Sequence, residues 1–276
     1  MLSRLLITSV FTGLFLSGCG GENDQTTQAS QEAAITDSTK SAESSFAESI
    51  GIAHGDDTWN SHQAIQGDIT VVFNGSERIK GNMIAETSVG RVRIELMDST
   101  ILVWDGNKAW VSPDTSSMQG ARFHLKTWPY FLAAPMKLDD PGTVWQDMTD
   151  GELLGQNYTR RKLTFKSGTG DSPDDWYIIY KEPDTDKLKA MSYIVTYGNT
   201  VEKASEAPHV IVYDDYQEVD GTMLARSWKF YNWSEEKGIQ GDSIGYVTVS
   251  NLSFTEVADS LFTEPTGARE DKMPEK

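Results

Sequence analysis

Cysteine is almost absent from this chain of 276 residues, because the only one is Cys19. No disulfide can form within the chain, so the fold has to be stable without one. A zinc site built from several cysteines is excluded for the same reason. The H-E-x-x-H signature of metalloproteases is also missing. The sequence therefore predicts no enzyme activity, no metal site and no cofactor.

Two features leave some chemistry open. His54 is followed by Asp56 and Asp57, which are metal-ligating residue types, although a helix end followed by a turn is the favoured interpretation. Acidic pairs such as Asp139-Asp140 are frequent. None of them is singled out as the acid and base of a glycosidase.

Basic residues are scarce. The chain has 24 Lys and Arg against 41 Asp and Glu, which gives a net charge of -17. Affinity for nucleic acid comes largely from Lys and Arg on phosphates, so this balance predicts no nucleic-acid partner. The favoured interpretation of the acidic surface is solubility.

Long apolar runs are missing as well. Residues 5–16 form a mostly apolar run after Arg4 that is too short to span a bilayer but has the length of a signal-peptide core. The following L-S-G-C at residues 16–19 resembles the bacterial lipoprotein signal. This resemblance implies that residues 1–18 are a signal peptide and that Cys19 is acylated, for example with palmitate. An ordinary cleaved signal is the alternative.

The residue after Cys19 is Gly20 rather than Asp, which resembles the pattern of lipoproteins sent to the outer membrane. Two or more acyl chains anchor a protein stably. We therefore expect an envelope protein that is lipid-anchored through Cys19, in the outer membrane and facing the periplasm.

Composition divides the remainder of the chain. Residues 19–45 carry few apolar side chains and are predicted to form a flexible tether behind the lipidated cysteine. Residues 46–265 are the predicted folded domain, and residues 266–276 a polar tail. Within the domain, Val92, Ile94 and Leu96 alternate with charged residues, as in a half-buried strand.

Turn signals separate several such runs, at Asn74-Gly75, Asp105-Gly106, residues 184–186 and Asp220-Gly221. They predict a mostly antiparallel sheet. Around Asp105-Gly106 we expect a two-residue type I′ turn that pairs Trp104 with Asn107. Both faces of that hairpin are apolar, with Leu102, Trp104 and Val111 on one and Ile101, Val103 and Trp110 on the other.

Two segments favour helix. In residues 44–54, Phe46, Ile50 and Ala53 share one helical face, and Gly55 is suited to end the helix. Residues 120–142 are rich in aromatic side chains but contain Pro129 and Pro135. Proline disrupts a helix interior, so one or two short helices crossing the sheet are predicted there.

Several motifs together resemble the LolA/LolB-like superfamily: residues 67–114 with their D-G hairpin, the acidic turn within 181–197, and the D-G turn within 214–231. The nearest resemblance is to an uncharacterised group of bacterial outer-membrane lipoproteins, through His54-Gly55…Trp59, P-x-x-L-x-D-P-G at 135–142 and LFTEP at 261–265. The resemblance implies a mainly β, α+β fold. It is an open, strongly curved antiparallel half-barrel whose concave face is covered by short helices.

In that class the space between sheet and helices holds acyl chains or other apolar ligands. The predicted function is accordingly a membrane-anchored periplasmic lipoprotein that binds a lipid or acyl chain, with a protein partner left unidentified. The residues expected to line the ligand are Leu102, Trp104, Trp110, Phe123, Trp128, Tyr130, Phe131 and Met136. The alternative is a structural or protein-interaction lipoprotein in which these side chains fill the core.

Overall fold

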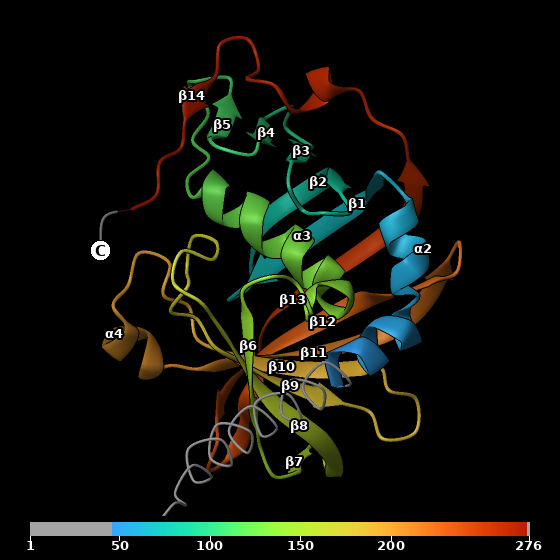
Figure 1. Ribbon diagram of the computed structural model, residues 1–276. Helices are drawn as coiled ribbons and strands as arrows, with labels where there is room; N and C mark the ends of the chain where they lie inside the picture. Colours follow the sequence, from blue (N-terminus) through green and yellow to red (C-terminus); the bar gives the residue numbers. More distant parts are fainter. Residues whose placement is uncertain (1–45, 275–276) are drawn as a thin grey trace, which may run out of the picture. The chain divides into compact units, whose positions relative to one another are not determined.

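The computed structural model describes residues 46–274 and contains a 14-stranded antiparallel sheet (Figure 1). In sheet order the strands are β14 (Arg269–Glu270), β5 (Ala109–Ser112), β4 (Ile101–Trp104), β3 (Val92–Leu96), β2 (Ser76–Glu86), β1 (Ala64–Phe73), β13 (Gly238–Thr255), β12 (Thr222–Ser234), β11 (His209–Val219), β10 (Leu188–Tyr193), β9 (Tyr177–Lys181), β8 (Gln156–Phe165) and β6 (Thr143–Asp147), with β7 (Gly151–Leu153) paired to β8. The end strands β14 and β6 do not pair with each other. The sheet is therefore open, and the predicted curved α+β half-barrel is confirmed.

Short turns join neighbouring strands where the sequence predicts them. The β1–β2 turn has positive φ at Asn74 (50°) and Gly75 (71°), and the β11–β12 turn has it at Asp220 (47°) and Gly221 (83°). Positive φ at both central residues defines the type I′ turn, whose twist matches that of the strands. Local turn chemistry thus sets the register of the longest hairpins.

The β4–β5 turn differs from the prediction by one residue. Asp105 pairs with Lys108 and Trp104 with Ala109, so the turn residues are Gly106 and Asn107 rather than Asp105 and Gly106. The Asp105 carboxylate accepts hydrogen bonds from the amides of Asn107 and Lys108, both at 2.8 Å, and this fixes the later turn. The paired residues shift by two positions, which preserves the predicted faces.

Each apolar face of this hairpin has its own cover. Leu102, Trp104 and Val111 belong to the main core. The opposite face of the neighbouring strand β3 is contacted by the 3₁₀ helix η1 (Asp259–Phe262). Phe262 is buried there beneath the Arg91 guanidinium, whose carbon lies 5.0 Å from the ring centre. The C-terminal segment therefore covers the outer face of β3 next to the hairpin.

The first helix (residues 46–54), α2 (Asp56–Ser61) and α3 (Ala121–Lys137) lie on one side of the sheet (Figure 1). Helix α4 (Val201–Ser205) follows them in the chain. The first three of these contribute buried residues to the main core together with the inward-facing residues of the sheet. None of the helices within residues 46–274 has the length and apolar character of a membrane-spanning helix.

Helix α3 corrects the prediction of one or two short helices. It continues for 17 residues and contains both Pro129 and Pro135. Each proline removes one backbone hydrogen bond, but both rings are buried, as are Leu125 and Leu132 on the same helix. Burial against strands β3, β4 and β5 outweighs the missing hydrogen bonds.

The end of the chain adds to the sheet. Within the predicted polar tail, Arg269 and Glu270 form β14 and pair with Val111 and Trp110 of β5. The Asp271 amide also donates to the Ala109 carbonyl at 2.8 Å. Cys19, the signal peptide and the tether lie outside the described residues, so the domain boundaries remain predictions.

Candidate functional site

A pocket of about 640 Å³ opens between helix α3 and the sheet. Its walls come from α3, from the ends of β1, β8, β9 and β10, from residues 195–197, and from two rims at residues 88–89 and 169–175. Ligand pockets typically have 300 to 1,000 Å³ and mostly apolar and aromatic walls. The size and position of this pocket agree with ligand binding.

Aromatic side chains form a continuous row along the pocket. Phe73 lies 6.0 Å from Trp128, Trp128 lies 6.3 Å from Phe131, and Phe131 lies 5.4 Å from Tyr193, measured between ring centres. Tyr177 continues the row at 6.0 Å from Tyr193. These five residues are called the aromatic row below. They present a wide apolar surface with phenol groups at intervals.

The carboxylates around the pocket are bound by neighbouring protein groups. Asp140 pairs with Lys137 at 2.7 Å. Asp171 accepts two hydrogen bonds from the Arg122 guanidinium, at 2.7 and 2.9 Å, and this bidentate pair connects the 169–175 rim to the first turn of α3. Asp175 accepts from the amide and hydroxyl of Thr196, both at 2.7 Å.

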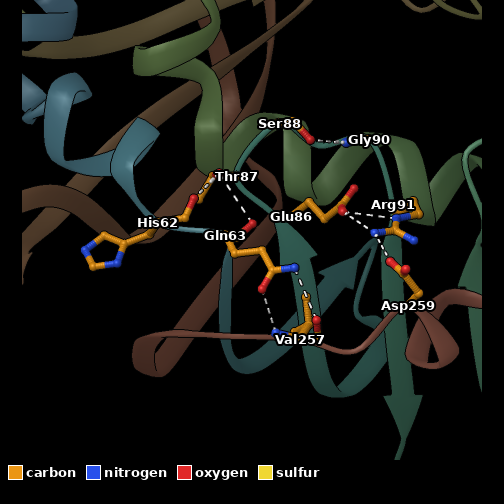
Figure 2. A network of polar contacts seen from close by, with 9 residues as sticks. All are labelled: His62, Gln63, Glu86, Thr87, Ser88, Gly90, Arg91, Val257 and Asp259. Carbon is orange, nitrogen blue, oxygen red and sulfur yellow. Dashed lines mark hydrogen bonds and ion pairs between the residues drawn. The ribbon is translucent and has the colours of Figure 1, made fainter.

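The other rim is held by the polar network that Figure 2 shows. The hydroxyl of Thr87 donates to the His62 carbonyl at 2.7 Å, and the Trp59 indole donates to the Thr87 carbonyl at 2.9 Å. On the far side of the turn, Arg91 pairs with Glu86 at 2.7 Å and with Asp259 at 2.9 Å. Residues 88 and 89 are thereby fixed at the pocket by groups that lie outside it.

Burial keeps one histidine and two tyrosines of the wall neutral near pH 7. The His124 ring accepts a hydrogen bond from the Trp128 indole at 2.8 Å, and burial, with the positive Arg78 nearby, lowers the pKa of His124 to about 4. Burial raises the pKa of Tyr197 to about 12 and raises the pKa of Tyr130 further. The pocket interior therefore presents neutral imidazole and phenol groups.

Two polar atoms in the pocket wall have no hydrogen-bond partner among the described residues: the Tyr197 hydroxyl and His209 Nδ1. A buried polar atom without a partner costs about 1 to 3 kcal/mol. Both atoms belong to residues that border the pocket. A bound molecule with polar atoms could satisfy them.

The predicted lining residues separate into two groups. Phe123, Trp128, Tyr130 and Phe131 border the pocket, because they lie on the face of α3 that turns toward it. Leu102, Trp104 and Met136 are instead buried in the main core. Trp110 lies on the opposite face of β5, where its indole donates to Asp105 at 2.7 Å. Contact between any of these residues and a ligand stays a prediction.

Trp104 shows why an aromatic-rich hairpin need not line a cavity. The Arg122 guanidinium carbon lies 4.7 Å and the Lys126 ammonium 4.3 Å from the Trp104 ring centre. Two cations from α3 therefore cover this indole.

The sequence did not predict that Tyr193, Val195 and Tyr197 border the pocket. These residues alternate in the sequence M-S-Y-I-V-T-Y, as residues on one face of a strand do. That alternation was the available signal.

His54 has a structural role outside the pocket. Its Nδ1 lies 2.7 Å from the Met223 carbonyl, and its Nε2 accepts from the Leu188 amide at 3.0 Å. Both ring nitrogens are thus occupied by backbone groups. Among residues 46–274, no group of three or more His, Cys, Asp or Glu is placed to hold a metal ion.

Comparison with known proteins identifies the architecture. A LolA superfamily protein from Nitrosomonas europaea superposes with a TM-score of 0.52 over 79% of this chain and 97% of its own, at 10% identity. A domain described as an outer membrane lipoprotein-sorting protein, from Vibrio parahaemolyticus, superposes with a TM-score of 0.50 over 80% of this chain and 96% of its own, also at 10% identity. The chain has the LolA fold.

The resemblance predicted from the sequence motifs is confirmed at the level of fold. No family model matches the chain, and no curated protein matches it significantly in sequence. In the LolA fold of this chain, the pocket lies between the sheet and the covering helix α3.

Proposed function

We propose that this protein is a periplasmic lipoprotein, anchored in the outer membrane through acylated Cys19, that binds a lipid or acyl chain in the pocket beside α3. The single observation that carries the proposal is the pocket itself, at about 640 Å³ with the aromatic row along its wall. A filled core would leave no such space. The fold shared with a lipoprotein-sorting domain supports an envelope role.

Apolar contact would supply most of the binding free energy. Each methylene of a chain moved from water onto the aromatic row contributes about 0.8 kcal/mol. Both rims are already assembled, because ion pairs and hydrogen bonds hold them. A preorganised pocket loses little entropy when a ligand binds.

The test uses the full chain with Cys19→Ser, which removes the predicted acylation site and changes no residue of the described fold. Native mass spectrometry would detect co-purified lipid, and displacement of a fluorescent fatty acid would measure affinity. We expect bound lipid and saturable uptake of the probe. A chain that carries no lipid and takes up no probe would refute the proposal and favour a structural or protein-interaction lipoprotein.

Two pocket variants make the test specific to the site. Phe123→Asp and Val195→Asp place a carboxylate at wall positions that are only partly buried, so the fold should survive. We expect each to weaken probe binding by about tenfold, because an acyl chain cannot solvate the charge. The matched control is Val144→Asp on β6, which is 42% exposed and lies outside the pocket. Equal loss in the control would mean that binding occurs elsewhere.

A further inference from the structure

Of the three Lys and Arg side chains that border the pocket, Lys137 is paired with Asp140, whereas the other two have no such partner. Asp140, Asp171 and Asp175 each bind a protein group, as described above. Lys126 and Arg78 border the same pocket, and within residues 46–274 no carboxylate forms an ion pair with either. These two cations stand at the pocket border without an ion-paired carboxylate, in a chain whose net charge is -17.

Lys126 is held in place by packing. Its ammonium lies 4.3 Å from the Trp104 ring centre, so the side chain crosses the indole instead of extending into water. The side chain is partly buried, and burial lowers the pKa of its amine. An anion beside the ammonium would stabilise the protonated, charged form of Lys126.

Tyr197 lies at the same end of the pocket. Its ring centre is 5.4 Å from that of Phe123, which precedes Lys126 by one helical turn. The Arg122–Asp171 ion pair lies near enough to affect the pKa of both Lys126 and Tyr197. The Tyr197 hydroxyl is buried and has no hydrogen-bond partner among the described residues.

An ammonium without an ion-paired carboxylate and a hydroxyl without a hydrogen-bond partner thus border the same pocket as the aromatic row. We infer that the pocket selects an amphiphile with an anionic head, a carboxylate or a phosphate, which Lys126 and Tyr197 contact while the chain lies on the aromatic row. This inference rests on the proposed function and names its ligand class. A neutral head would leave the ammonium unpaired, and a cationic head would be repelled by it.

The experiment compares three ligands that share one chain: palmitate, hexadecyl phosphate and hexadecanol. Affinities are measured below the aggregation limit of each, by displacement of a fluorescent probe from the full chain carrying Cys19→Ser. We expect both anions to bind about fivefold or more tightly than the alcohol, which is the effect of one partly exposed ion pair. Added salt should reduce this preference. The two anions distinguish a carboxylate head from a phosphate head.

Variants assign the preference to named groups. Lys126→Gln should abolish the preference for the anions and leave hexadecanol affinity nearly unchanged. Tyr197→Phe should reduce the affinity for the anions, while the contacts of the ligand's hydrocarbon chain with the aromatic row stay the same. The matched control is Lys80→Gln on β2, which removes a half-exposed cation outside the pocket and should keep the wild-type preference.

The outcomes separate the inference from the proposed function. If all three ligands bind with equal affinity, or if the preference persists in Lys126→Gln, the anionic-head inference is refuted while lipid binding stands. If none of the three ligands displaces the probe or binds directly, the proposed function fails and the inference fails with it.

Discussion

Acid should destabilise this protein through His54, whose imidazole is completely buried. The neutral ring donates to the Met223 carbonyl through Nδ1 and accepts the Leu188 amide at Nε2. Protonation would put a hydrogen on Nε2 and break the second bond. Burial, opposed by the bond to Met223 and assisted by the positive Lys187, lowers the pKa of His54 from 6.5 to about 4. Tyr216 packs edge-on against the imidazole, with the ring centres 5.3 Å apart.

The sign and size of the effect follow from this shift. The folded-state pKa is below the unfolded value, so the unfolded chain binds more protons between pH 6.5 and about 4. The contribution of His54 to stability is complete above pH 6.5 and is lost as the pH falls toward 4. The full shift corresponds to about 3 kcal/mol, of which about 2 kcal/mol is lost by about pH 5.

Urea unfolding at about pH 7.5 and pH 5, followed by tryptophan fluorescence, measures this loss. Since burial also lowers the pKa values of His124 and His209, the wild-type loss includes their contributions. The decisive quantity is therefore the difference between wild type and His54→Gln, which should lose about 2 kcal/mol less over this interval. The control is His62→Gln, whose ring stacks on Phe254 at 4.0 Å. A His54→Gln variant with the wild-type pH dependence would refute the reasoning.

Other substitutions test the close approach at Gly55, the 169–175 rim and the predicted lipid anchor at Cys19. Gly55→Ala should destabilise the fold by about 3 kcal/mol or more in urea unfolding, because the new Cβ would lie 2.2 Å from a carbonyl oxygen of the β11–β12 turn. Gly75→Ala, at a similar positive φ but with nothing within 4 Å, should cost only about 1 kcal/mol, and equal losses would contradict the steric argument. Arg122→Met should speed amide exchange selectively in residues 166–175, since it removes a partly buried bidentate ion pair; unchanged exchange would show that the pair does not hold the rim. Cys19→Ser should release the protein from the membrane fraction, and retention there would contradict acyl anchoring.

Local chemistry made much of the sheet predictable. Asn74-Gly75 and Asp220-Gly221 turn as expected because positive φ is inexpensive for these residues. The two faces of the β4–β5 hairpin were also predicted correctly, although the register was not. An error of one residue in the turn centre moves the pairing by two, so the inward and outward residues stay the same. Only the Asp105 side chain, which caps the turn, distinguishes the two registers.

The pocket was harder to predict because its wall is assembled from segments far apart in the sequence. Phe73, Trp128 and Tyr193 belong to three different elements and meet only once the sheet curves beneath α3. Because Pro129 and Pro135 argued against one long helix, the sequence did not predict α3, which places residues 123–131 in one wall of the pocket. Whether an aromatic residue lines a cavity or fills a core depends on what covers it, as the cations over Trp104 show.

The His54-Gly55…Trp59 motif has a physical explanation that does not involve the ligand. His54 binds backbone groups of β10 and β12, Gly55 permits a close approach to the β11–β12 turn, and Trp59 donates to the Thr87 carbonyl beside the pocket rim. The motif therefore fastens the first helices to the sheet and to one rim. On the anionic-head inference, ligand choice depends on side chains outside the motif, above all Lys126 and Tyr197 in the pocket wall. Substitutions in the motif should consequently lower stability for every ligand alike, whereas substitutions at those two positions should change which head group is preferred.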